Sequence, residues 1–272
     1  MKPILTLTAA TLSLAVLLAS PAPAAAASHS TATGRPSADG ILRQMSSTLG
    51  SARSLHFEAH RQIDPALIGN RNLPTDAHIV VTILRPNKLY ARSTSKGDVR
   101  DIYADGQNLT LVDVTKNFYA SVPMRTSLDG LVAELDRKYG FTPPLAELAL
   151  SNVYEDIRWK ARSITYVGDE RIPGGFLGLS GVRCHRLALS GQVLDAELWV
   201  GIDDHLPKKL VATAKTRAGK PQIKVDLSSW NLAPSVGEHE FTFVPPKDAT
   251  KIPIATADGI RSPIVARKSK PA

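Results

Sequence analysis

The sequence predicts a mainly β protein, in which a curved antiparallel sheet or incomplete β-barrel carries an N-terminal helix and a helical insert. Segments with alternating apolar and polar residues recur at short, even spacing from about residue 54 to residue 230, and turn residues separate them. Helical periodicity is confined to residues 36–49 and 127–150. Many short strands with few helices are typical of open barrels and strongly curved sheets.

Residues 36–49 predict an amphipathic helix ahead of the first strand. Pro36 opens it, Ser37 or Asp39 can cap it, and Gly50 closes it. Its apolar residues recur at helical spacing along one side: Ile41, Leu42, Met45 and Leu49.

A first meander of half-buried strands follows the helix. Alternation places Leu55, Phe57 and Ala59 on one face and His56, Glu58 and His60 on the other. The same period predicts that Ile79, Val81 and Ile83 share an apolar face. Further strands are expected at 88–95, 99–104, 108–114 and 117–122, with Asp105-Gly106 forming a type I′ hairpin turn.

The helical insert lies between this meander and a second one. Residues 127–139 carry Leu128, Leu131, Val132 and Leu135 at helical spacing and end at Gly140, and a short second helix is expected at 144–150. Strands of the second meander are predicted at 164–173, 182–189, 196–202, 208–215, 222–230 and 241–244. We expect one domain over residues 36–254.

The N-terminus predicts export. Met1 and Lys2 precede an apolar run that ends at Leu18, and Pro21 and small residues follow it, which is the order of a cleavable signal peptide over residues 1–27. Cleavage is expected after Ala27, or otherwise after Ala24. A membrane anchor is the alternative, but the run is shorter than the ~20 apolar residues that a span needs. Residues 28–35 are expected to be a linker.

The chain has a formal net charge of +8, and its basic residues are scattered. No basic-aromatic motif accompanies them, so nucleic acid is not an expected partner and attraction to a membrane surface is the milder interpretation. The one basic concentration is the tail at 255–272, which cannot bury apolar area and is predicted to be disordered.

The single cysteine, Cys184, excludes an internal disulfide, and it lies far from the cleavage region, so we expect no lipid attachment there. In an apparent strand it is expected to be a small buried hydrophobic residue.

The sequence carries no recognisable catalytic or metal motif. His56, Glu58 and His60 share a strand face, but alternate positions lie roughly 7 Å apart, which is too wide for one zinc ion. The stretch 178–181 resembles a nucleophile elbow, but Val182 stands where the second glycine is required. We therefore expect no enzyme activity, no metal and no cofactor.

A curved sheet with one apolar face, covered by helices with apolar stripes, encloses an interior that is either filled by side chains or open to a ligand. From composition alone the filled interior is the simpler expectation.

Several short motifs resemble a known superfamily. RPNKLY at 85–90, YADGQNL at 103–109 and FTFVPP at 241–246 resemble the periplasmic outer-membrane lipoprotein carriers of the LolA/LolB-like superfamily. More closely, the chain resembles an uncharacterised family of predicted periplasmic proteins over about residues 38–251. That likeness adds FYASVP at 118–123, YGF at 139–141, PLAEL at 144–148 and SWNLAP at 229–234.

The resemblance implies a LolA-like, eleven-stranded, incompletely closed barrel whose helical lid covers an interior that takes up acyl chains. Arg85 matches the arginine that ties the lid shut in such carriers, although it could also simply begin a strand at the rim with its charge in water. Leu89 and Ala91 stand where the carriers show aromatic residues, which weakens the case for lipoprotein cargo. The candidate cavity residues are Phe57, Ile79, Val81, Ile83, Leu89, Leu109, Leu128, Leu131, Leu135, Leu145, Leu148, Trp199, Phe241 and Phe243.

Two functions follow from these expectations. The first is a monomeric, non-catalytic periplasmic carrier of a lipid, a lipoprotein acyl chain or another hydrophobic ligand, with transient contact to a membrane surface or an envelope protein. The second is an envelope sensor that binds a partner protein through the same fold.

Overall fold

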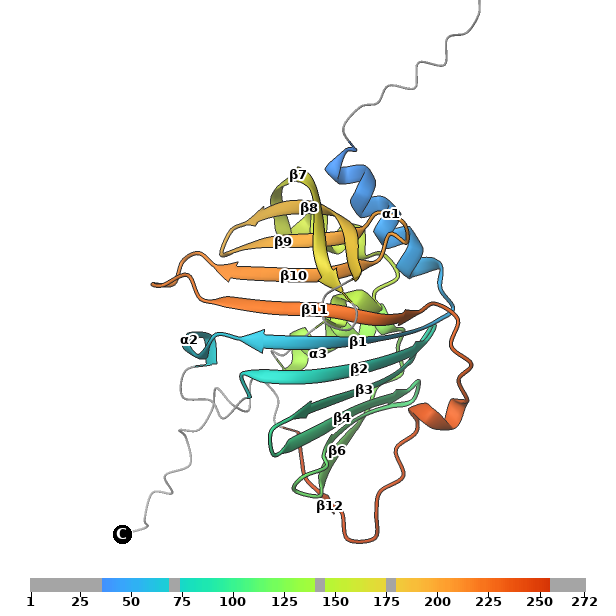
Figure 1. Ribbon diagram of the computed structural model, residues 1–272. Coiled ribbons are helices and arrows are strands. Elements are labelled where there is room, and N and C mark those ends of the chain that lie inside the picture. Colours follow the sequence, from blue (N-terminus) through green and yellow to red (C-terminus); the bar gives the residue numbers. More distant parts are fainter. Residues whose placement is uncertain (1–35, 69–73, 140–144, 175–179, 255–272) are drawn as a thin grey trace, which may run out of the picture. The chain divides into compact units, whose positions relative to one another are not determined.

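The computed structural model describes residues 36–68, 74–139, 145–174 and 180–254. The predicted signal peptide, linker and basic tail lie outside these residues. Twelve strands form one sheet in the order β12-β6-β5-β4-β3-β2-β1-β11-β10-β9-β8-β7 (Figure 1). Every neighbouring pair is antiparallel except β12 with β6. The predicted mainly β fold class, with its helical additions, is confirmed.

The sheet consists of two meanders joined where β11 pairs with β1. The first meander comprises β1 Ser54–Ile63, β2 Asp76–Leu84, β3 Lys88–Ser95, β4 Asp98–Asp105, β5 Asn108–Asp113 and β6 Phe118–Pro123. The second comprises β7 Ala161–Gly174, β8 Ser180–Gly191, β9 Leu194–Gly201, β10 Pro207–Ala214 and β11 Gln222–Asn231, and β12 Thr250–Lys251 lies at the far edge. The resemblance implied eleven strands, and this two-residue edge strand accounts for the difference.

The helices come from three parts of the chain. The N-terminal helix α1 spans Ala38–Ser51, and the Ser37 hydroxyl caps it by accepting a 2.9 Å hydrogen bond from the Gly40 amide. The short helix α2 spans Pro65–Ile68. The insert contains α3 Leu128–Tyr139, the 3₁₀ helix η1 Ala146–Ala149 and α4 Val153–Lys160. Within the described residues, no helix is long and apolar enough to cross a membrane.

Two features of the insert differ from the prediction. The expected helix at 144–150 is a 3₁₀ turn in its described part, and α4 was not predicted. Because α4 has only eight residues, and just two of them, Val153 and Tyr154, are buried, it carries too short an apolar stripe to show a helical period.

The helices divide the apolar face of the sheet into two clusters. Beneath α3, the side chains of Leu128, Leu131 and Leu135 pack with apolar residues of β1, β2, β4, β5 and β11. Beneath α1 and α4, the side chains of Leu42, Met45 and Val153 pack with apolar residues of β8 and β9. Figure 1 shows α3 behind the sheet, at the level of β11 and β1.

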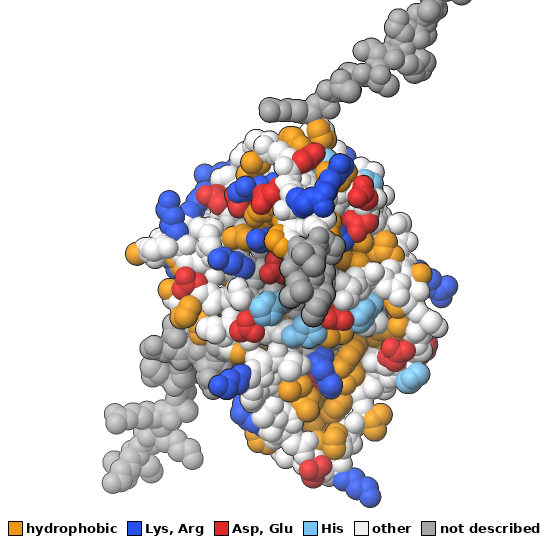
Figure 2. Space-filling view, viewed as in Figure 1, with side chains coloured by type: hydrophobic (Ala, Val, Ile, Leu, Met, Phe, Trp, Pro, Cys, Tyr) orange, Lys and Arg blue, Asp and Glu red, His pale blue; other side chains and the backbone are white. Residues whose placement is uncertain are grey.

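The opposite face of the sheet, which we call the outer face, carries charged side chains of both signs and histidines, as Figure 2 shows. The predicted histidine row lies here. His56 lies 3.0 Å from the Thr82 hydroxyl, Glu58 pairs with His78 at 3.0 Å, and His60 pairs with Asp76 at 2.8 Å. Each member thus has a cross-strand partner, and the described residues contain no group of three metal ligands.

Trp199 also lies on the outer face, which corrects its assignment as a cavity residue. It packs with Cys184 and Val211, and its indole N–H donates to Glu170 at 3.0 Å. Trp199 and the buried Leu198 point to opposite faces because strand residues alternate.

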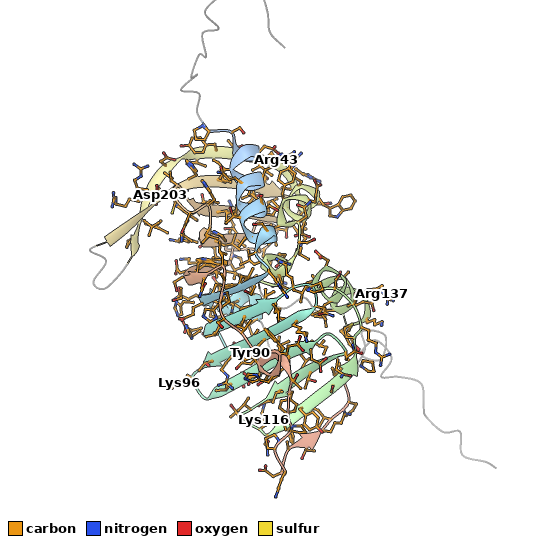
Figure 3. All side chains as sticks on the ribbon, turned by 90° about the vertical axis from the view of Figure 1, so that its right-hand side faces the viewer. Arg43, Tyr90, Lys96, Lys116, Arg137 and Asp203 are labelled. Carbon is orange, nitrogen blue, oxygen red and sulfur yellow. The ribbon has the colours of Figure 1, made fainter. Side chains whose placement is uncertain are left out.

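The C-terminal aromatic residues require a second correction. Phe241 ends a 3₁₀ helix, η3 Glu238–Phe241, which packs against β3 and β4, so the strand predicted at 241–244 is wrong. Phe243 packs on Tyr103 and Tyr119 of the outer face, with ring centroids 5.5 and 5.2 Å apart. Tyr90, labelled in Figure 3, lies 5.0 Å from Tyr103 in the same aromatic group. Neither phenylalanine faces the helices.

The hairpin at Asp105-Gly106 has the predicted place but another mechanism. Only Gly106 has a positive φ, +87°, whereas a type I′ turn needs two such residues. The Asp105 carboxylate instead accepts hydrogen bonds from the amides of Gln107 and Asn108, at 2.8 and 2.7 Å. This side-chain turn fixes the β4–β5 register.

The packing of Cys184 with Trp199 and Val211 on the outer face predicts that its thiol is unreactive. Cys184 is fully buried, and burial raises the pKa of its thiol to about 11. Because the thiolate is the reactive form, iodoacetamide labelling of the native protein should be slow at pH 8 and still slow at pH 9. Labelling should become fast in urea. Equal labelling rates in native and unfolded protein would contradict the buried placement.

Candidate functional site

The Arg85-Pro86 step joins three helical segments at the end of β2. The Arg85 guanidinium donates to carbonyls at the end of α1, those of Leu49 at 3.4 Å and Ala52 at 3.2 Å. It also donates to carbonyls at the end of η1, those of Ala149 at 2.6 Å and Leu150 at 3.1 Å. A guanidinium suits this place because it offers several donors in a fixed plane, and helix ends leave carbonyls without partners.

Pro86 extends the same junction to the third helix. Its carbonyl accepts a 2.9 Å hydrogen bond from the amide of Leu128, the first residue of α3. Burial lowers the pKa of the Arg85 guanidinium below its usual value, and the nearby Asp129 carboxylate opposes that shift. The Asp129 carboxylate itself accepts from the Ser151 amide at 2.8 Å. The strand end therefore contacts α1, α3 and η1 within one half-buried polar cluster.

The space beneath α3 is nearly filled. Most of the predicted cavity residues lie here, and several of them line a void of only about 40 Å³, which is room for a few water molecules at most. Phe57 is fully buried and stacks on Trp230, with ring centroids 4.6 Å apart. Eight predicted residues line this small void: Val81, Ile83, Leu89, Leu109, Leu128, Leu131, Leu135 and Leu145.

A much larger cavity, about 440 Å³, lies between α4 and strands β8 to β11. This volume is within the range of small-molecule sites. The lining is mostly apolar and includes Met45, Leu145, Leu148, Val153, Ile157, Leu189, Leu198, Leu210 and Leu227. Among the predicted cavity residues, only Leu145 and Leu148 line it.

Small residues explain why this part of the interior is open. Ala161, Gly191, Ala196 and Ala212 line the cavity from β7 to β10, where larger side chains would fill it. Ala196 pairs with Leu189 on one side and with Ala212 on the other, so these positions form a row on one face. Most of the large apolar residues singled out in the sequence instead fill the space beneath α3.

Charged residues lie at the mouth of the cavity. Lys160, at the end of α4, pairs with Asp156 at 2.8 Å and with Glu147 at 3.4 Å, and all three line the cavity. Burial lowers the pKa of the Lys160 ammonium, but the hydrogen bond to Asp156 and the charge of Glu147 outweigh it and raise the pKa overall. Lys160 therefore stays protonated at neutral pH.

Comparison with family models identifies the group to which the chain belongs. The model described as "Predicted periplasmic protein (DUF2092)" matches residues 38–255. The chain is a member of this family. The resemblance noted from the sequence motifs is thereby confirmed. A comparison with curated proteins gives no match.

Solved structures similar to this DUF2092 member are distant. A LolA superfamily protein from Nitrosomonas europaea is 13% identical, with a TM-score of 0.34 and coverage of 77% of this chain and 99% of that one. A putative outer membrane lipoprotein-sorting protein domain from Vibrio parahaemolyticus is 9% identical, with a TM-score of 0.34 and coverage of 75% and 95%. The MucA/MucB complex structure from Pseudomonas aeruginosa gives 14% identity, a TM-score of 0.40 and coverage of 76% and 63%.

The Arg85 junction predicts a measurable loosening on substitution. Arg85→Leu removes four hydrogen bonds and leaves carbonyls at two helix ends without a donor, which should cost about 2–4 kcal/mol of unfolding free energy. Amide hydrogen exchange should accelerate in α1, η1 and the start of α3 before it does in β8 and β9.

Arg85→Lys is the matched control, because it keeps the charge but cannot reach four carbonyls, and its effect should be intermediate. Unchanged exchange in the helices of Arg85→Leu would show that this residue does not hold them together.

Proposed function

We propose that this periplasmic protein binds an amphiphilic molecule with an acyl-type chain in the cavity between α4 and β8–β11. The observation that carries the proposal is an apolar cavity of about 440 Å³ beneath a helix, in a domain whose other apolar cluster is nearly filled. Filled interiors leave no such space, since protein cores pack to the density of organic crystals.

The arrangement of the lining favours a ligand with one apolar end and one polar end. The interior residues Leu198, Leu210 and Leu227 offer no hydrogen-bonding side chain, which suits a hydrocarbon chain. The mouth carries Lys160, Glu147 and Asp156, which can hydrogen-bond a polar or zwitterionic head group. We infer that the chain enters first and that the head group stays beside Lys160.

Arg85 serves this function indirectly. It lies outside the cavity lining, but it ties η1 to α1, and η1 carries Glu147 and Leu148 of that lining. We infer that the Arg85 hydrogen bonds hold the helices over the apolar face of the sheet. When these hydrogen bonds break, the helices can move and admit the ligand, so Arg85 is a positioning residue.

Filling the cavity should abolish binding. Ala196→Phe places a ring among the small residues of the lining, so the affinity for a fluorescent fatty acid should fall at least about tenfold, or about 1.4 kcal/mol. Titration of the purified protein with the fluorophore measures this change. Because the ring enters empty space, thermal stability should change little.

Ala188→Phe is the matched control. Ala188 lies beside Leu189 on β8 but pairs with Glu197 on the outer face, so the same substitution there should leave binding unchanged. Equal loss in both variants, or no uptake of the fluorophore by the wild-type protein, would overturn the proposed function.

A further inference from the structure

An exposed tryptophan directly precedes Lys160, a residue of the cavity lining. Trp159, in the last turn of α4, has 89% of its surface exposed, whereas Trp199 is 4% exposed and Trp230 is partly buried. The other side of α4 packs against the protein interior through Val153, Tyr154 and Ile157. An indole in water has no stabilising role in the fold, and large exposed apolar groups at a site mark contact surfaces.

A second apolar projection lies at the same end of the sheet. The β8–β9 turn carries Val193 and Leu194, which are 56% and 49% exposed, and both also line the cavity. Ala161, two residues after Trp159, pairs with Gly191 at the start of this turn. The turn and the end of α4 therefore lie side by side at the cavity mouth.

Basic residues occur next to Trp159 in the sequence and on the turn that adjoins Val193. Arg158 and Arg162 flank Trp159 in sequence, and the β10–β11 turn contributes Arg217 and Lys220. That turn adjoins the apolar one, because the Lys215 amide donates to the Val193 carbonyl at 3.2 Å. The nearby carboxylates of Glu147, Asp156 and Asp195 pair with Lys160 and Lys215. Arg217 donates a 3.3 Å hydrogen bond to the Ala66 carbonyl, and the charge of Arg158 contributes to lowering the pKa of Asp39. Among the ion pairs of the described residues, none involves Arg158, Arg162, Arg217 or Lys220.

We propose that this rim docks the protein on an anionic phospholipid bilayer, with Trp159, Val193 and Leu194 inserted at the head-group level and with Arg158, Arg162, Arg217 and Lys220 near the lipid phosphates. Tryptophan favours the membrane interface because its ring is apolar and its N–H is polar. Each cation near an anionic surface adds about 1 kcal/mol at modest ionic strength. The cavity mouth then faces the lipid, and an acyl chain passes without crossing water.

The mature full-length protein tests the proposal with phosphatidylglycerol and phosphatidylcholine vesicles. Sedimentation should show binding to phosphatidylglycerol, weaker binding at high salt and little binding to phosphatidylcholine. Tryptophan emission should shift to the blue on binding. Trp159→Ser should weaken vesicle binding at least tenfold and abolish the shift.

Val244→Ser is the matched control, because Val244 is 79% exposed but lies outside the rim, and it should bind vesicles as the wild type does. Docking goes beyond the proposed cavity function and can fail separately. Ala196→Phe should still bind vesicles, and Trp159→Ser should still take up the fatty-acid fluorophore from solution.

Absence of wild-type binding to phosphatidylglycerol vesicles would overturn the proposal, as would full binding by Trp159→Ser. If a photo-crosslinker at position 159 captures a protein in the periplasm while vesicles do not bind, the rim is a protein-docking surface and the bilayer proposal is wrong.

Discussion

The arrangement of the helices depends on the Arg85-Pro86 step. The Arg85 guanidinium donates hydrogen bonds to carbonyls at the ends of α1 and η1. The Pro86 carbonyl accepts a hydrogen bond from the amide of Leu128, the first residue of α3. The end of a helix carries carbonyl or amide groups that lack a partner within the helix. Over an apolar sheet, a helix end is therefore held at the place where hydrogen-bond partners for these groups are available. The strand end supplies these partners at one point, so the cover of the apolar face is fixed at the end of β2 and held elsewhere by side-chain packing.

The two parts of the covered face differ because of side-chain size. Beneath α3, leucine, isoleucine and phenylalanine meet from both sides, and the space closes to about 40 Å³. Beneath α4, alanine and glycine on the strands leave about 440 Å³. The charged group at the mouth and the apolar β8–β9 turn line the open part, and the exposed Trp159 directly precedes Lys160 of that group. The ligand entry, ligand binding and membrane contact that we propose would all take place at this end of the sheet.

Much of the fold could be predicted because alternation and turn residues report directly on half-buried strands, as in Phe57 and Ile79. Arg85 contacts the ends of two helices, and its role as a lid latch, which the family resemblance implies, stays a prediction. The position of the cavity could not be predicted from the sequence. An apolar face of large side chains fills the interior and one of small side chains leaves it open, but both show the same pattern of hydrophobicity. The sequence also assigns Trp199 and Phe243 to the wrong face of the sheet. Aromatic residues can pack on either face, and only the strand pairing shows which face a given residue is on. The eight residues of α4 were too few to reveal a period.

We propose that the ligand occupies the space beneath α4 and not the space beneath α3. The most direct test is methyl NMR of the protein bound to a spin-labelled fatty acid, with Leu198, Leu210 and Leu227 as reporters of the open cavity and Ile83 and Leu109 as reporters of the filled one. Our account predicts strong broadening of the first group and little change in the second. Broadening centred on Ile83 and Leu109, or on neither group, would contradict it.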